Sequence, residues 1–365
     1  MRDASMKKEK RRNSKQRKAA VRRLVITCSA VIVFCAAIGA WQLYLLYGKS
    51  ITAHDGEEHL FYISPSTPVT AVLDSVTAAY DISSPLSLRL HAHLMHYPAE
   101  GQQYARTGCY KLPARLGTKQ LIQTFRNGWQ TPVKVTIRNI RTQGQLSARL
   151  ASQLMLDSAD IATRLADKGY MERFGLNTAT AVSLFIPDTY EMYWDIAADN
   201  LFIRMKHEYD KFWNDNRLAL AAELGYQPWQ IATIASIVEE ETNKEEDMPI
   251  IAGLYMNRLR IGMPLQSCPT VKFALQDFSL RRILNKHLEY ESPYNTYRHA
   301  GLPPGPIRIP RAKTMDYVLH PVKSNYLFMC ASTAFDGTHH FSSTYSEHAA
   351  YARRYQNELN KRGIK

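Results

Sequence analysis

The strongest constraint on this chain is an uncharged run of 25 residues, Leu24–Gly48. A helix rises 1.5 Å per residue, so this run is long enough to cross a hydrocarbon core of about 30 Å. Trp41, Tyr44 and Tyr47 lie near its end, where aromatic side chains meet a membrane–water interface. We therefore predict a transmembrane helix at residues 24–48. A cleaved signal peptide is the alternative, since Ala37-Ile38-Gly39 is a small-x-small triplet, but the apolar run continues well beyond it.

Most of the positive charge precedes this run. Residues 1–23 hold eleven Lys and Arg against two acidic residues, which is +9 of the net charge of +13 and leaves +4 for the other 342 residues. Basic charge before a span places the N-terminus in the cytoplasm. We expect a single-pass protein of the cytoplasmic (inner) membrane, with a basic cytoplasmic tail at 1–23 and an extracytoplasmic, periplasmic body. A nucleic-acid-binding arm is the alternative for the tail; the adjoining span argues against it, and no nucleic-acid partner is expected.

The sequence after the span predicts a small α/β domain at residues 61–132, preceded by a polar linker at 49–60. Short strands are expected at 61–63 and 108–112, and helices from Val69 and from Thr118. Residues 84–97 show apolar helical spacing at Leu86, Leu90 and Leu94.

A larger mixed α+β region is predicted at residues 133–365. A strand is expected at 133–137, and helices at 146–156, 158–168, 200–224, 249–260 and 343–361, with a turn-rich loop at 262–271 and a buried strand at 327–331. Residues 291–310 contain five prolines and two glycines. A loop of this length in a compact region is more often a binding or active-site element than a linker.

The cysteines indicate no disulfide framework. Cys28 and Cys35 lie inside the predicted span, which leaves Cys109, Cys268 and Cys330, an odd and widely spaced set. We expect free, buried thiols, with a bridge from Cys109 to either of the other two as the alternative.

The sequence Pro228–Thr242 predicts a helix that carries an acidic side chain on its buried face. Apolar residues recur at 231, 234, 235 and 238, while Glu240 falls opposite them in solvent and Glu239 lies near their edge. Glu241 continues the apolar row. A buried carboxylate must be paired or have a raised pKa, and a raised pKa suits a general acid near neutral pH. The alternative is a structural ion pair with a buried arginine.

A metal site is a weaker alternative. His339, His340 and His348 with Glu347 could ligate a metal, but their spacing matches no strong zinc pattern. We expect no metal and no cofactor, and a substrate-contacting or structural role for His339.

Several segments together resemble one known family, the MltG (YceG-like) endolytic murein transglycosylases. The segments are Ala235–Thr242, Asn257–Gln266 with Pro269-Thr270-Val271, Tyr294-Asn295-Thr296-Tyr297, Gly301–Pro306 and Gly337–Phe341, and more weakly Gly108-Cys109-Tyr110 and Leu184–Tyr190. The resemblance covers about residues 60–360. It implies an α+β protein with one N-terminal span, a LysM-like domain at 61–132 and a YceG-like catalytic domain at 133–365.

The resemblance also implies a mechanism. The catalytic glutamate of the family is the second acid of its Glu-Lys-Glu-Thr pattern, which falls on Glu241. As the single general acid and base, it would cleave between N-acetylmuramic acid and N-acetylglucosamine of peptidoglycan glycan strands and leave 1,6-anhydro ends. Peptidoglycan synthases are implied as possible partners. The residues expected to position the glycan are Gln266, Thr270, Tyr294, Asn295, Thr296 and His339.

Two departures from the family pattern lie beside the predicted site. Glu240 replaces a basic residue, which should push the pKa of Glu241 upward, and Cys268 replaces an aspartate before Pro-Thr. Two alternative functions stay open. One is a hydrolytic muramidase, which would need a second carboxylate from Asp188 or Glu191; the other is a non-catalytic peptidoglycan-binding or divisome scaffold.

Overall fold

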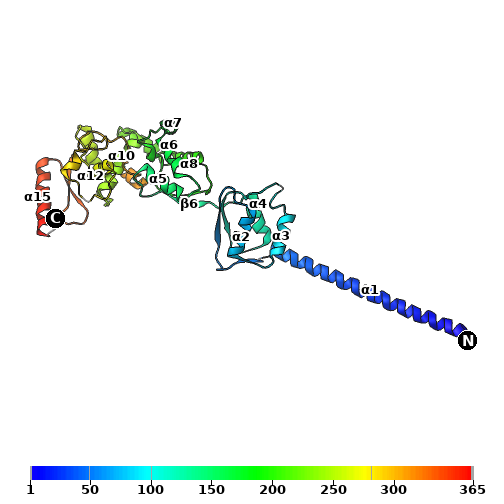
Figure 1. The fold of residues 1–365 in the computed structure, drawn as a ribbon. Coiled ribbons are helices and arrows are strands. Elements are labelled where there is room, and N and C mark those ends of the chain that lie inside the picture. Colours follow the sequence, from blue (N-terminus) through cyan, green and yellow to red (C-terminus); the bar gives the residue numbers. More distant parts are fainter. Residues whose placement is uncertain (1, 49, 100, 281, 363–365) are drawn as a thin grey trace. The chain divides into compact units, whose positions relative to one another are not determined.

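The structure, a computed structural model, describes residues 2–48, 50–99, 101–280 and 282–362 (Figure 1). The remaining seven positions, among them the first residue of the predicted tail, one linker residue and the last three of the predicted catalytic domain, lie outside the described ranges. The chain divides into two compact units, Met1–Pro132 and Val133–Lys365. Both mix helices and short strands, so the predicted α+β class is confirmed.

The first unit begins with α1 (Arg2–Tyr47), a single helix of 46 residues. Its segment Arg17–Tyr47 is long and apolar enough to cross a membrane, and in the described residues it is the one helix that meets this criterion. The apolar side chains of this segment are exposed, for example Val33 and Phe34. An exposed apolar helix of this kind fits the predicted transmembrane segment.

The rest of the first unit packs short antiparallel strands against three helices. One sheet has the strand order β3-β1-β5 and another pairs β2 with β4. Tyr80, Tyr110 and Phe125 are among the largest side chains of the core. The elements are β1 (Ile51–Ala53), β2 (His59–Ile63), α2 (Val69–Ala79), β3 (Tyr80–Ile82), α3 (Pro85–Leu94), β4 (Gly108–Leu112), β5 (Arg115–Leu116) and α4 (Thr118–Asn127).

One prediction for this unit is wrong, and one predicted helix buries a different face from that of its spaced leucines. The predicted linker at 49–60 contains β1, the central strand of its sheet, because Ile51 and Ala53 are buried there. The helix at 85–94 exists, but its three spaced leucines, Leu86, Leu90 and Leu94, are 80%, 47% and 63% exposed. The helix instead buries its other face, Ser87, Leu88, His91 and Ala92.

The second unit has two neighbouring hydrophobic cores. One gathers residues 135–205 with Ile309, and the other surrounds α10 and α11. Its strands form two antiparallel pairs, β6 with β7, which are far apart in the sequence, and β8 with β9. The elements are β6 (Val133–Thr136), α5 (Gln143–Ala151), α6 (Ser158–Ala166), α7 (Lys168–Glu172), η1 (Ala181–Leu184), β7 (Thr189–Met192), α8 (Ala198–Phe212), α9 (Asp215–Glu223), α10 (Pro228–Glu241), α11 (Met248–Arg260), α12 (Cys268–Leu275), α13 (Asn285–Leu288), α14 (Ala312–Leu319), β8 (Phe328–Ala331), β9 (His339–Ser342) and α15 (Tyr345–Lys361).

Three local predictions need correction here. The helix expected at 200–224 is two helices, because the Asn214 side chain accepts a hydrogen bond from the Arg217 amide and starts α9. The turn-rich loop expected at 262–271 already contains the first turn of α12. The cysteines are free as predicted, but of the three beyond α1 only Cys109 is buried, and Cys268 is exposed.

Candidate active site

The candidate site lies at the C-terminal end of α10, which crosses the second core. The helix starts at Pro228, and the Gln230 side chain accepts a hydrogen bond from the Gln227 amide at 2.8 Å. Every residue from Ile231 to Glu239 is buried. This confirms the predicted helix and explains why its last turn is held firmly by its surroundings.

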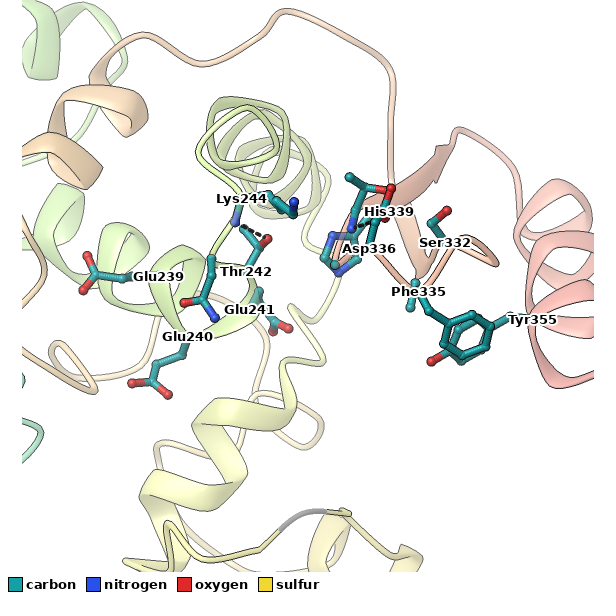
Figure 2. Close-up of a pocket in the computed structure, with 14 residues that line it drawn as sticks. Glu239, Glu240, Glu241, Thr242, Lys244, Ser332, Phe335, Asp336, His339 and Tyr355 are labelled. Atoms are coloured by element: carbon teal, nitrogen blue, oxygen red, sulfur yellow. Dashed lines mark hydrogen bonds between the residues drawn. The ribbon is translucent and has the colours of Figure 1, made fainter. Parts of the chain in front are cut away.

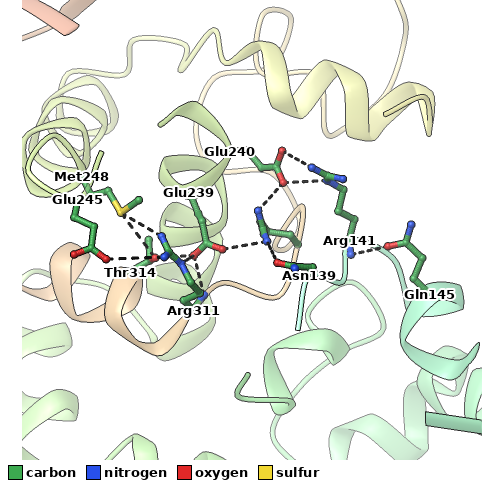
Figure 3. A network of polar contacts seen from close by, with 10 residues as sticks. Asn139, Arg141, Gln145, Glu239, Glu240, Glu245, Met248, Arg311 and Thr314 are labelled. Atoms are coloured by element: carbon green, nitrogen blue, oxygen red, sulfur yellow. Dashed lines mark hydrogen bonds and ion pairs between the residues drawn. The ribbon is translucent and has the colours of Figure 1, made fainter. Parts of the chain in front are cut away.

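The three glutamates at this end have different environments. Glu239 is buried and accepts hydrogen bonds from the Arg311 amide at 2.8 Å and the Thr314 hydroxyl at 2.6 Å. It also pairs with Arg308 (Figure 3). Glu239 is therefore a structural anion that ties α10 to the segment leading into α14.

Glu240 is not in solvent, as the helical pattern predicted. Its side chain is 17% exposed, and both of its oxygens bind Arg141 at 3.0 and 3.1 Å, while Oε1 also binds Arg308 at 2.9 Å (Figure 3). The helix pattern could not show these arginines, which come from residues about 70 to 100 positions away. The expected upward effect of Glu240 on the pKa of Glu241 is weakened, because two cations compensate its charge.

Glu241 has no cation in contact. The Tyr255 hydroxyl donates to its Oε1 at 2.8 Å and the Ser267 hydroxyl donates to the same oxygen at 2.5 Å. Burial raises the pKa of the Glu241 carboxyl above its ordinary value; the hydrogen bonds from Ser267 and Tyr255 and the charges of His339 and Arg258 act in the opposite direction. The predicted raised pKa is confirmed. Both hydroxyl contacts are on Oε1, and within the described ranges no side chain donates to Oε2.

The loop around Ser267 is fixed by buried polar side chains. The Ser267 amide donates to the Thr296 hydroxyl at 3.0 Å, and the Thr270 hydroxyl donates to the Ser267 carbonyl at 2.7 Å. Asn295 donates to the carbonyls of Leu288 and Tyr290 at 2.9 and 2.8 Å.

Thr270, Asn295 and Thr296 were expected to position the glycan. Each is at most 1% exposed, so their side chains brace the loop and do not reach a ligand. Gln266 is exposed at a positive φ of 53°, and its amide donates to the Thr296 carbonyl at 3.1 Å. Tyr294 is half-buried against Phe273, with ring centroids 4.7 Å apart.

A cleft of about 490 Å³ opens beside Glu241, between the end of α10, the segment 331–339 and α15. Figure 2 shows the Glu241 side chain leaving the helix on the side of His339, while Glu239 and Glu240 leave in other directions. The cleft is also lined by Lys244, Asp336 and Tyr355. Of the predicted glycan-binding residues, His339 is the one that lines this cleft.

His339 is held by a buried aspartate. The Asp247 carboxylate accepts hydrogen bonds from the His339 amide at 3.1 Å and from its Nδ1 at 2.9 Å. An imidazole that donates through Nδ1 presents Nε2 on its other side. The two residues therefore form a fixed polar pair in the cleft wall.

The other histidines of the suggested metal cluster are separated from this pair. His340 stacks on Tyr351 and His348 stacks on Phe328. Among the residues that the structure describes, no group of three or more His, Cys, Asp or Glu side chains is placed to hold a metal ion.

Sequence reasoning missed four residues of this site, namely Tyr255, Ser267, Asp247 and Lys244. Tyr255 lies on the buried face of α11, between Leu254 and Met256, and looks like an ordinary core aromatic. One signal was available for Ser267, because it precedes a Cys-Pro segment that starts a helix, as capping residues do.

The comparisons with known proteins find relatives that share one name. An endolytic murein transglycosylase of Bacillus subtilis (strain 168) is 38% identical over 133 residues, which is 36% of this chain and 36% of that protein. One of Streptococcus pneumoniae (strain D39) is 34% identical over 123 residues, 33% of this chain and 22% of that protein. The matched part is thus about a third or less of these relatives.

A solved structure and a family description extend the likeness over most of the chain. The crystal structure of a putative YceG-like protein from Listeria monocytogenes matches with a TM-score of 0.53 and 25% identity, over 80% of this chain and 99% of that one. The sequence model of the YceG-like family matches residues 61–354. The chain therefore belongs to the YceG-like family.

Proposed function

We propose that this protein is a membrane-anchored lytic transglycosylase that cleaves peptidoglycan glycan strands internally. The observation that carries the proposal is the Glu241 carboxyl, whose pKa is raised by burial and whose Oε1 is held by two hydroxyls beside an open cleft. The names of the two relatives support the reaction class.

The proposed reaction uses Glu241 twice. The protonated carboxyl donates its proton to the oxygen between N-acetylmuramic acid and N-acetylglucosamine, and the bond from that oxygen to C1 breaks. The acetamido group of the substrate stabilises the cationic centre at C1. The C6 hydroxyl then bonds to C1 and gives its proton to Glu241, which closes the 1,6-anhydro ring and restores the acid. No water is consumed.

The hydroxyls of Tyr255 and Ser267 have a defined part in this cycle. They donate to Oε1, and hydrogen bonds to a carboxylate are stronger than those to a neutral carboxyl. They therefore stabilise the anion that exists after the first proton transfer. The proton itself is carried by Oε2, which is left for the substrate.

The proposed location follows from the N-terminal helix. Its basic end lies in the cytoplasm and the two folded units lie outside the inner membrane, with residues 61–132 as a LysM-like domain and 133–365 as the catalytic domain. Gln266, Tyr294 and His339 contact the glycan, and peptidoglycan synthases are the partners that would supply new strands.

Hydrolysis is the second candidate, and one observation favours it. Asp336 lines the same cleft as Glu241, and its hydrogen bonds from Thr338 lower the pKa of its carboxyl, so it is ionised and could activate a water. Asp188 and Glu191, the carboxylates first considered for this role, do not line the cleft.

The test is a digest of purified murein by the wild type and by Glu241→Gln. The expected result is anhydro-ended fragments from the wild type, lighter than reducing ends by one water, and no cleavage by the variant. Glu245→Gln, which alters an exposed glutamate bound to Lys313, is the matched control. Cleavage by folded Glu241→Gln at near wild-type rate refutes the acid role, and reducing ends identify a muramidase.

A further inference from the structure

The first unit carries an apolar stripe that its own described residues leave exposed. Leu86, Leu90 and Leu94 follow each other at four-residue spacing on α3, and they are 80%, 47% and 63% exposed. Arg89 and His93 lie exposed between them. A helix with one face in the core and a leucine stripe flanked by basic residues on another is typical of attachment to a membrane interface.

The structure places the first turn of α3, where the stripe begins, beside the end of the apolar helix. The Ser87 hydroxyl, in the first turn of α3, donates to Oε1 of Gln42 on α1 at 2.6 Å. The Ser50 hydroxyl donates to the Leu45 carbonyl at 2.8 Å, and Leu45 is only 2% exposed. The last turns of α1 are therefore packed against the rest of the first unit (Figure 1).

The level of Gln42 relative to a bilayer can be estimated. The uncharged run starts at Leu24, and a hydrocarbon core takes about 20 helical residues, so it ends close to Gln42. Trp41 and Tyr44, which are 53% and 51% exposed, mark the same level as an aromatic belt. Leu86, next to Ser87, therefore lies at the boundary between acyl chains and headgroups.

We infer that α3 is a second membrane contact, which lays Leu86, Leu90 and Leu94 into the outer leaflet of the bilayer that α1 crosses. The occupant of the stripe is lipid: the leucines meet acyl chains, and Arg89 meets the phosphate groups above them. The consequence is a fixed orientation of the first unit on the membrane, because two elements instead of one hold it. This inference rests on the proposed membrane anchoring by α1.

The test uses the full-length protein in vesicles of phosphatidylglycerol and phosphatidylethanolamine that contain lipids brominated close to the headgroup, since bromine quenches nearby tryptophan. Leu90→Trp is compared with Leu218→Trp, which replaces a leucine on α9 of the second unit with 41% exposure. Both are made in a Trp41→Phe background, and the signal of each introduced tryptophan is its difference from that background, which keeps Trp129, Trp194, Trp213 and Trp229. Leu94→Trp repeats the measurement at a more exposed position of the stripe.

The expected result is strong quenching of the tryptophans at 90 and 94 and none at 218. Quenching at 90 and 94 no greater than at 218 overturns the inference; a protein partner on the stripe would give this outcome in pure lipid. Quenching of Trp41 itself, from the difference between the wild type and Trp41→Phe, tests the anchor separately. An unquenched Trp41 would overturn the proposed anchoring and the inference together.

Discussion

Removing the Tyr255 hydroxyl should move the pH dependence of activity upward. In Tyr255→Phe, the Glu241 carboxylate loses one of its two hydroxyl donors, at 2.8 Å, and keeps Ser267. Both bonds lower the pKa of Glu241 against the effect of burial. The acid should therefore hold its proton to higher pH in the variant.

The magnitude follows from the kind of bond. A hydrogen bond to a charged group contributes about 1.5–3 kcal/mol, and a tenfold change in a proton equilibrium corresponds to about 1.4 kcal/mol. The basic limb of the profile should shift upward by about one to two pH units. The rate at the plateau should fall, because the carboxylate formed by proton donation is less stabilised.

The assay is kcat/KM for release of soluble fragments from murein, measured from about pH 5 to 9, because this ratio reports the ionisation of the free enzyme. Tyr317→Phe is the matched control: Tyr317 also donates to a glutamate, Glu245, at 3.1 Å. That variant should keep the wild-type profile. A basic limb in Tyr255→Phe that stays in place or moves to lower pH would refute the assignment of Glu241 as the acid.

Three further predictions concern the same region. Glu239→Gln should lower the free energy of unfolding by about 1–3 kcal/mol in a denaturant titration, because the buried Glu239 loses its charge-assisted bonds to Arg308 and to the Thr314 hydroxyl, while Arg308 keeps Glu240 as a partner; a loss under about 0.5 kcal/mol would contradict this. Because the folded-state pKa of Glu241 is raised, its stabilising contribution is present below the unfolded pKa and is lost as pH rises, so Glu241→Gln should gain stability relative to the wild type as pH rises above the ordinary glutamate pKa of about 4.3; a difference that does not change with pH would argue against burial of the acid. His339→Ala should move the basic limb of the pH profile of kcat/KM upward, since the charge of His339 lowers the pKa of Glu241; an unchanged profile would place His339 outside the electrostatics of the site. The same variant should lower the free energy of unfolding by about 1–3 kcal/mol, because it leaves the Asp247 side chain unpaired.

The sequence was sufficient to predict α10, the helix that carries Glu241. Apolar spacing from Ile231 to Val238 is a local pattern, and local patterns depend only on helix geometry. The same pattern placed Glu241 on the buried side, and its raised pKa follows from burial. The uncharged run at 24–48 was equally clear, because membrane thickness sets a length that any sequence must meet.

The hydrogen-bond partners of Glu241 could not be predicted from the sequence, because tertiary structure brings them together. Tyr255 and Ser267 are 14 and 26 positions from Glu241, and a periodic pattern contains no information on such pairs. The same limit explains the error at Glu240, whose arginines come from other elements. The exposure of Leu86 could not be predicted for a different reason. Helical spacing identifies an apolar face, but it does not show whether another part of the protein covers that face.

The placement of the arginines explains how three consecutive glutamates can have three roles. An arginine in contact would lower the pKa of Glu241 and make it a poor acid. The fold instead directs Arg308, Arg311 and Arg141 to Glu239 and Glu240, on other sides of α10, and gives Glu241 two neutral hydroxyls. Neutral donors orient the carboxyl and stabilise its anion, while the charges of His339 and Arg258 act on it without a hydrogen bond to the carboxyl. The ion pairs of the first two glutamates thus hold the end of the helix, and this leaves the third with a raised pKa at the edge of the cleft.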